Sequence, residues 1–262
     1  MRLVVRKPSA ALAPFVRTIS IVETHDEATR TLLPDTGMTL GLRYGGFASE
    51  LNRSAQRLPD ASFSGLRRQA RIMRTSAGGG VVIARFREAG AAEFLAEPLH
   101  ELFGTTLDLA SVIPASALER IRQQLAEAPS DEARIQLVDD FLLQRRRAHR
   151  PDHVVACALA ALQQSAGRLR IEPLARRLGL GRDRLEKRFR AAVGTTPKHH
   201  ASLLRLHRAI QLQRSGRPLS EVALDAGYFD QAHLTRDFRA LVGSSPQRFF
   251  ASAVHTSCGA EP

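Results

Sequence analysis

The chain has 262 residues, of which 44% are hydrophobic and 24% are charged, and its formal net charge is +12. This composition is that of an ordinary globular protein, and the length suits one or two domains. Two cysteines, Cys157 and Cys258, exclude a disulfide framework and a four-cysteine zinc site and suit a reducing cytoplasm. No apolar run approaches the ~20 residues of a membrane span, and the N-terminus lacks the features of a signal peptide.

The positive charge is concentrated in the second part of the chain. Residues 151–262 hold 17 Lys and Arg against 9 Asp and Glu, which gives +8 of the total of +12. A basic region favours a polyanionic partner such as nucleic acid, membrane headgroups or an acidic protein. Solubility alone also explains such a surface, so the charge by itself leaves the function open.

Residues 1–114 have the pattern of a small, mostly-β domain. Three stretches rich in Val, Ile, Leu and aromatic residues are bounded by Pro, Gly and Asp, which predicts strands at 16–22, 38–44 and 81–86. One short helix is expected within residues 89–103, with Pro98 starting, ending or kinking part of it.

Residues 115–150 predict a helical connector. Apolar residues recur at spacings of three and four over 118–125 and again over 135–142, with Ala-Pro-Ser-Asp between the two runs. The basic run at 145–151 fits a solvated linker or an arm that contacts phosphates. A further helix is expected over 153–166, ending at Gly167, and Cys157 is expected in its core face.

The most informative feature is an internal repeat. Residues 171–197 (IEPLARRLGLGRDRLEKRFRAAVGTTP) align with residues 219–246 (LSEVALDAGYFDQAHLTRDFRALVGSSP). An alanine, a glycine, a leucine, a phenylalanine and a Gly-x-x-Pro motif recur 48 or 49 residues apart, and the extra residue of the second copy falls in the turn. Two copies in register in a basic region argue against an unspecialised helical bundle.

Each copy has the residue pattern of a helix-turn-helix. A small residue, Ala175 or Ala223, suits a close helix crossing, and Gly179 or Gly227 suits a sharp turn. The second helix of each copy then carries apolar residues on one face. The closing GTTP or GSSP predicts a helix stop, a hydroxyl cap and a proline in the next first turn.

The opposite faces of these second helices carry polar side chains suited to a DNA groove. Arg pairs with guanine, Gln with adenine, and Asp or Glu accepts from cytosine. Gln231 lies near the helix start, where base edges are usually contacted. Asp230 is expected to cap its helix, whereas Asp183 fits a cap and a base reader equally well.

Residues 154–250 closely resemble the DNA-binding domain of the AraC/XylS family of bacterial transcription regulators, most clearly in GYFDQAHLTRDFRALVGSSPQRFF. The resemblance implies two helix-turn-helix units joined by a long helix over about 197–214, which read successive major grooves. Gly181 replaces the Ser that often precedes the first recognition helix. The resemblance and the exposed helix faces together give the candidate DNA-binding residues, which are Arg182, Asp183, Glu186, Lys187, Arg190, Gln231, Ala232, His233, Thr235, Arg236 and Arg239.

The expected fold is α+β: a cupin-like, mostly-β domain at 1–114, a helical connector at 115–150, an all-α DNA-binding domain at 151–250 and a disordered tail at 251–262. The expected function is a sequence-specific transcription regulator at the nucleoid in the cytoplasm. The N-terminal domain is expected to sense a small-molecule effector, to dimerise, or both.

Further partners are promoter DNA and, for an activator, RNA polymerase; no membrane, cofactor or metal is expected. His200 and His207 share a helix face but lack a suitably spaced carboxylate or cysteine. Two alternatives remain: an enzyme domain fused to a DNA-targeting module, for which acids such as Glu23 and Asp35 would serve, and a non-specific architectural DNA binder.

Overall fold

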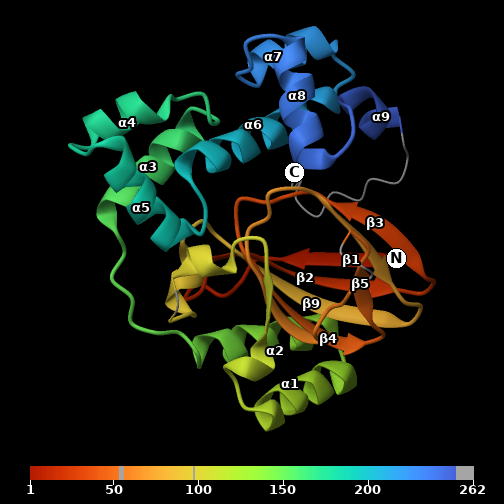
Figure 1. Cartoon of the computed structure of the whole chain (residues 1–262). Helices are drawn as coiled ribbons and strands as arrows, with labels where there is room; N and C mark the ends of the chain where they lie inside the picture. The colour runs from red at the N-terminus through yellow and green to blue at the C-terminus, as the bar shows by residue number, and fades with distance from the viewer. Residues whose placement is uncertain (53–55, 97, 252–262) are drawn as a thin grey trace.

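The computed structural model describes residues 1–52, 56–96 and 98–251. The predicted tail, including Cys258, therefore lies outside the described residues apart from Ala251. The predicted α+β class, with a β-rich N-terminal domain and a helical C-terminal domain, is confirmed (Figure 1). The domain boundaries at 114, 150 and 250 stay predictions.

The strands are β1 (Arg2–Arg6), β2 (Val16–Thr24), β3 (Ala28–Leu32), β4 (Thr39–Gly45), β5 (Ala48–Glu50), β6 (Gln56–Arg57), β7 (Ala61–Ser64), β8 (Arg71–Thr75), β9 (Gly79–Phe86) and β10 (Thr106–Asp108). The α-helices are α1 (Ala115–Glu127), α2 (Asp131–Leu143), α3 (His153–Gln164), α4 (Ile171–Arg177), α5 (Arg182–Val193), α6 (Pro197–Gln213), α7 (Leu219–Asp225), α8 (Gln231–Val242) and α9 (Pro246–Ala251). The short 3-10 helices are η1 (Gly90–Glu93), η2 (Leu99–Leu102) and η3 (Leu109–Ser111).

The strands form two antiparallel sheets. One has the order β1-β2-β9-β4-β7-β10 and the other the order β3-β8-β5-β6. Alternation along β9 divides its side chains between two environments: Val82, Ala84 and Phe86 are fully buried in the core, while Val81 and Ile83 line an internal cavity. The six-stranded sheet therefore has a core face and a cavity face.

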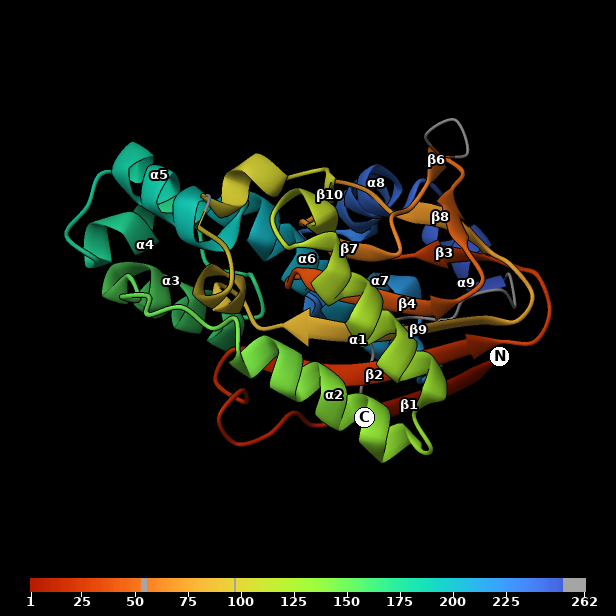
Figure 2. The ribbon, with the colours of Figure 1, turned by 90° about the horizontal axis from the view of Figure 1, so that it is seen from below.

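The predicted connector helices are present as α1 and α2, and they cover the core face of the six-stranded sheet (Figure 2). Leu118, Ile121 and Leu125 of α1 are buried against the domain, as are Val138 and other apolar residues of α2. Helix α2 begins after Ser130, whose hydroxyl accepts a hydrogen bond from the Ala133 amide at 3.2 Å. The apolar faces of both helices are thus used within their own domain.

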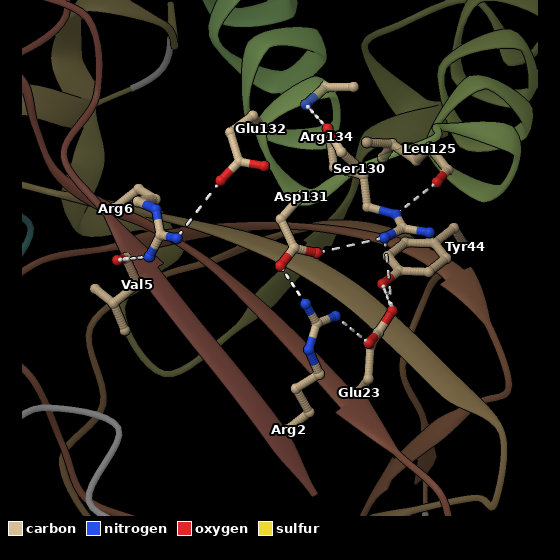
Figure 3. Close-up of polar contacts among 11 residues, drawn as sticks. Arg2, Val5, Arg6, Glu23, Tyr44, Leu125, Ser130, Asp131, Glu132 and Arg134 are labelled. Carbon is tan, nitrogen blue, oxygen red and sulfur yellow. Dashed lines mark hydrogen bonds and ion pairs between the residues drawn. The ribbon is translucent and has the colours of Figure 1, made fainter.

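A polar network fastens the start of α2 to the sheet (Figure 3). The Arg2 guanidinium donates to Asp131 and, at 2.7 Å, to Glu23, while the Tyr44 hydroxyl donates to Glu23 at 2.7 Å. Arg134 lies over the Tyr44 ring, 5.0 Å from its centroid. The hydrogen bonds from Tyr44 and Arg2 lower the pKa of the Glu23 carboxyl. Glu23, which was considered for the enzyme alternative, is therefore engaged in a structural network.

Two local predictions need correction. In place of one short helix within residues 89–103 there are two short 3-10 helices: Ala89 has a φ of 61°, η1 follows it, and Pro98 starts the separate η2, which is one of the roles expected of this proline. A left-handed residue and a proline each interrupt the α-helical hydrogen-bond ladder. Cys157 is exposed, because α3 buries Val155, Ala158, Leu159 and Leu162 on the opposite face.

The basic run at 145–151 begins against the N-terminal domain. The Arg146 guanidinium lies 3.2 Å from Glu93 and 4.4 Å from the centroid of the Phe15 ring, and the Arg147 amide donates to the Glu93 carbonyl at 2.7 Å. The first part of this run is thus anchored to the protein rather than fully solvated. Within the described ranges, no helix is long and apolar enough to cross a membrane.

Candidate nucleic-acid interface and internal cavity

The first helix-turn-helix consists of α4 and α5. Ala175 is 1% exposed where the two helices cross, and its carbonyl accepts from the Leu180 amide at 3.0 Å across the turn. Gly179 has a φ of 69°, as the predicted sharp turn requires. Gly181 precedes α5 without a side-chain cap, so Asp183 is not the N-cap but lies at the second helical position. The first of its two suggested roles is thereby excluded.

The second helix-turn-helix consists of α7 and α8, with Ala223 fully buried and Gly227 at a φ of 88°. Asp230 caps α8 as predicted, because its carboxylate accepts from the His233 amide at 2.6 Å. The His233 ring in turn accepts at Nδ1 from the Phe229 amide at 3.3 Å. This reciprocal pair fixes the start of α8, the end that recognition helices present to base edges.

Helix α6 joins the two units. It begins after Thr196, whose hydroxyl accepts from the His199 amide at 3.1 Å, and Pro197 lies in its first turn. Gly194 and Gly243, which end α5 and α8, have φ values of 90° and 83°. The GTTP and GSSP motifs therefore act as predicted, and α6 crosses above the β-domain with one helix-turn-helix unit at each end (Figure 1).

The structure places the candidate residues of α5 on its solvent side, opposite the buried Leu185 and Phe189. Four of them are exposed and Glu186 is half-buried; the exposed four are Arg182, Asp183, Lys187 and Arg190. Arg188 points elsewhere and donates two 2.7 Å hydrogen bonds to Asp152. These bonds lower the pKa of the Asp152 carboxyl and remove Arg188 from the candidate surface.

The candidate residues of α8 lie opposite the buried Leu234 and Phe238. His233 and Thr235 are half-buried and the others are exposed, namely Gln231, Ala232, Arg236 and Arg239. The Thr235 hydroxyl donates its proton to the Gln231 carbonyl at 2.8 Å, so its oxygen is left to accept a hydrogen bond from a ligand. Sequence reasoning missed Phe229, which precedes α8 and is 85% exposed.

The cations on these two faces lack internal partners. In the part of the chain that the structure describes, none of Arg182, Lys187, Arg190, Arg236 and Arg239 forms an ion pair. By contrast, Arg205 and Arg217, elsewhere in the same domain, pair with carboxylates at 3.3 and 2.7 Å. Unpaired cations on both recognition helices make a surface suited to a polyanion.

A cavity of about 190 Å³ lies inside the β-domain. Its walls are largely apolar, and Arg43, Arg67, Arg71 and Arg85 also border it. Arg85 pairs with Asp35 at 2.8 Å, and Arg67 and Arg71 lie within 4 Å of the buried Glu50. Burial lowers the pKa of Arg43, which is 8% exposed and whose Nε has no hydrogen-bond partner within the described residues. The cavity thus combines apolar walls with buried positive charge.

Two segments that line this cavity also contact the helical C-terminal domain. The Pro34 carbonyl accepts from His207 Nε2 at 2.8 Å, and the Arg67 carbonyl accepts from His199 Nε2 at 3.1 Å. A carbonyl only accepts, so both imidazoles donate from Nε2. The Ala70 amide also donates to the Leu241 carbonyl at the end of α8 at 2.7 Å. None of these contacts joins residues that are close in sequence, so no local pattern predicts them.

Two family models match the chain, a helix-turn-helix domain at residues 174–252 and a domain of unknown function (DUF6597) at residues 5–108. No curated protein matches. Similar solved structures include a ligand-free variant of ToxT from Vibrio cholerae strain SCE256, at 12% identity over 94% of this chain and 99% of that chain, with a TM-score of 0.49.

The C-terminal domain of AraT, a response regulator from Geobacillus stearothermophilus, matches at 20% identity over 44% of this chain and 97% of that chain, with a TM-score of 0.38. The AraC-like transcriptional activator CuxR matches at 15% identity over 86% and 91% of the two chains, with a TM-score of 0.27.

The helix-turn-helix match covers the second repeat and all but the first residues of the first repeat, so the chain carries a helix-turn-helix domain after a β-rich N-terminal domain.

Proposed function

We propose that the chain reads two successive major grooves of promoter DNA with α5 and α8. The observation that carries this proposal is the pair of exposed, unpaired cationic faces held at the two ends of one helix. Helix α6 has 17 residues and spans about 25 Å. Successive major grooves on one face of a duplex lie about 34 Å apart, and a connector of comparable length supports the proposal that α5 and α8 enter two of them.

The side chains divide into base readers and phosphate contacts. Gln231, Ala232 and Arg236 lie in the first two turns of α8, and Arg182, Asp183 and Lys187 in the first two turns of α5. These positions suit base edges, because recognition helices insert their N-terminal residues into the groove. Arg190 and Arg239 lie toward the helix ends and suit phosphates. Glu186, His233 and Thr235 border these surfaces as polar supports.

A selection of genomic fragments by the full chain at ~150 mM salt tests sequence specificity. One enriched motif spanning about two helical turns supports it, whereas uniform binding supports the architectural alternative. On the selected site, Arg236→Ala is expected to weaken binding by about 1–3 kcal/mol, as for a base-reading arginine. Arg217→Ala, which removes an arginine paired with Asp225, is the matched control. Unchanged affinity of the Arg236 variant refutes its assignment.

We also propose that the cavity of the N-terminal domain binds a small effector with an apolar body and an anionic group. A volume of about 190 Å³ exceeds the ~150 Å³ of a cavity that accommodates benzene. Buried Arg43 supplies a charge that an anion would offset, since the nearby Asp60 already accepts from Arg122 at 2.9 Å. Met1 and Leu3 border the cavity and are 47% and 43% exposed, which provides an opening.

The shared wall supplies a route from effector to DNA. Pro34 and Arg67 line the cavity, and their carbonyls accept hydrogen bonds from α6. An effector that displaces either segment therefore changes the position of α6 relative to the N-terminal domain. The effector shifts the affinity for DNA only as far as it binds one position of α6 more tightly than the other.

Octanoate and octanol test the effector class, because they share an apolar chain and differ in charge. Octanoate is expected to raise the melting temperature of the full chain more than octanol does, and Arg43→Met is expected to abolish the difference. Arg57→Met, an exposed change outside the cavity, is the control. Equal shifts with both compounds would refute the anionic group.

The remaining partner proposals concern assembly. β1 is the edge strand of the six-stranded sheet, so its outer backbone groups could pair with a second copy to form a homodimer. Light scattering of the purified chain measures this directly. RNA polymerase is the proposed partner of an activator. We propose a site of action at the nucleoid in the cytoplasm and no catalytic activity.

A further inference from the structure

A second cleft, distinct from the internal cavity, lies where the N-terminal domain meets the first helix-turn-helix. Its volume is about 360 Å³. The N-terminal domain contributes Arg68, His100 and Phe103, the end of α5 contributes Arg190, and the beginning of α6 contributes Lys198. The cleft therefore requires both domains.

Three cations from three separate segments border this cleft: Arg68, Arg190 and Lys198. All three are exposed, and none forms an ion pair in the described ranges. No Asp or Glu is among the described residues that line it. Asp237 lies close enough to influence the charge of His199 in the cleft wall, but its carboxylate is already paired with Arg205 at 3.3 Å. Three positive charges border one cleft with no carboxylate in its described lining, so the cleft is electrostatically complementary to an anion.

The wall between these cations is fixed and carries a neutral hydroxyl donor. The Thr195 hydroxyl group belongs to a residue that is 4% exposed, and it has no hydrogen-bond partner in the part of the chain described here. The His199 ring is held by its bond to the Arg67 carbonyl and by an edge contact with Phe103, at 5.7 Å between ring centroids. Helix α6 begins here, and its N-terminal dipole adds positive potential.

We propose that this cleft binds a phosphate group and thereby ties the N-terminal domain to the first recognition helix. Guanidinium groups match phosphate oxygens in geometry, and Arg68 and Arg190 approach from opposite domains. The phosphate belongs either to a free phosphorylated molecule or to the DNA backbone beside α5. Both sources present the same phosphate group to the cleft. They differ in whether the cleft is filled before DNA binds.

The first arm of the test uses inorganic pyrophosphate and the full chain without DNA. Calorimetric titration at constant ionic strength is expected to show saturable binding that Arg68→Gln weakens at least tenfold. Arg120→Gln, which removes an exposed arginine of α1 that forms no ion pair among the residues described by the structure, is the matched control and is expected to bind like the wild type. This result identifies a free phosphorylated ligand, and it stands whether or not the chain binds DNA as proposed.

The second arm measures DNA affinity against salt concentration. If the phosphate is that of the backbone, pyrophosphate does not bind, and Arg68→Gln lowers the slope of log K against log salt by about 0.9, the value of one phosphate contact. Lys198→Gln is expected to do the same, and Arg120→Gln to leave the slope unchanged. The proposal is overturned if Arg68→Gln and Lys198→Gln alter neither pyrophosphate binding nor the salt slope.

Discussion

The buried imidazole of His200 makes the stability of this protein depend on pH. His200 lies on α6, is 0% exposed, and contacts the edge of the Phe189 ring at 5.7 Å between centroids. Neither ring nitrogen has a hydrogen-bond partner in the described residues. The pKa of His200 is lowered to about 4, mainly by burial; His199, Arg17 and His207 act in the same direction, and Glu88 opposes them.

The direction of the effect follows from the two protonation states. Well above pH 6.5 the imidazole is neutral in both the folded and the unfolded chain, so it contributes no pH dependence there. As the pH falls from 6.5 toward 4, the unfolded chain binds a proton that the folded chain excludes, which favours unfolding. With pKa values of 6.5 and about 4, the loss of stability between pH 8 and pH 5 is about 2 kcal/mol.

Urea denaturation of the wild type and of His200→Phe at pH 8 and pH 5 measures this contribution. The variant is expected to lose about 2 kcal/mol less stability than the wild type on going to pH 5, because phenylalanine does not titrate. His153→Phe, which makes the same exchange at an exposed position of α3, is expected to retain the pH dependence of the wild type. Equal losses for His200→Phe and the wild type would refute the assignment of a buried, neutral imidazole.

Two further substitutions test the helix-turn-helix framework. Gly194→Ala is expected to destabilise the chain by about 1–3 kcal/mol, since the residue has a φ of 90° and a Cβ would lie 3.0 Å from the Leu99 backbone carbonyl oxygen of the N-terminal domain; thermal unfolding measures it, and an unchanged melting temperature would contradict the close packing of the domains. Asp230→Ala removes the cap of α8 and is expected to cost about 1 kcal/mol. Asp230→Ser, which retains a capping oxygen, should recover most of that loss, and a failure to recover would assign another role to Asp230.

Short-range patterns were sufficient to predict the DNA-binding half. The repeat predicted the turn glycines Gly179 and Gly227, the cap at Asp230 and the stop at Gly194, because each depends on a few neighbouring residues. The exposed faces of α5 and α8 followed from helical periodicity for the same reason. Their contacts with DNA stay predictions.

Long-range packing was beyond the reach of such patterns. Residues 89–103 have helical composition, yet this segment contains two 3-10 turns that bury residues in the core, with Gly90 packed against the Phe15 backbone. Cys157 was misplaced because an alanine-rich helix gives no clear distinction between its faces. The cavity and the phosphate cleft assemble residues from distant segments, such as Arg68 and Lys198, and only the folded chain brings them together.

The position of α6 connects these sites mechanically. His199 and His207 lie eight residues apart, about 12 Å along the helix, and each bonds to a carbonyl of a segment that lines the cavity. One helix-turn-helix unit is attached at each end of α6, so a displaced wall tilts both recognition helices together and leaves each unit intact. A neutral hydrogen bond contributes about 1 kcal/mol, and breaking both of these bonds shifts an equilibrium by roughly 30-fold. That is within the 1–3 kcal/mol of typical allosteric coupling, so the proposed effector needs to disturb no more than these two contacts to change the tilt of both recognition helices.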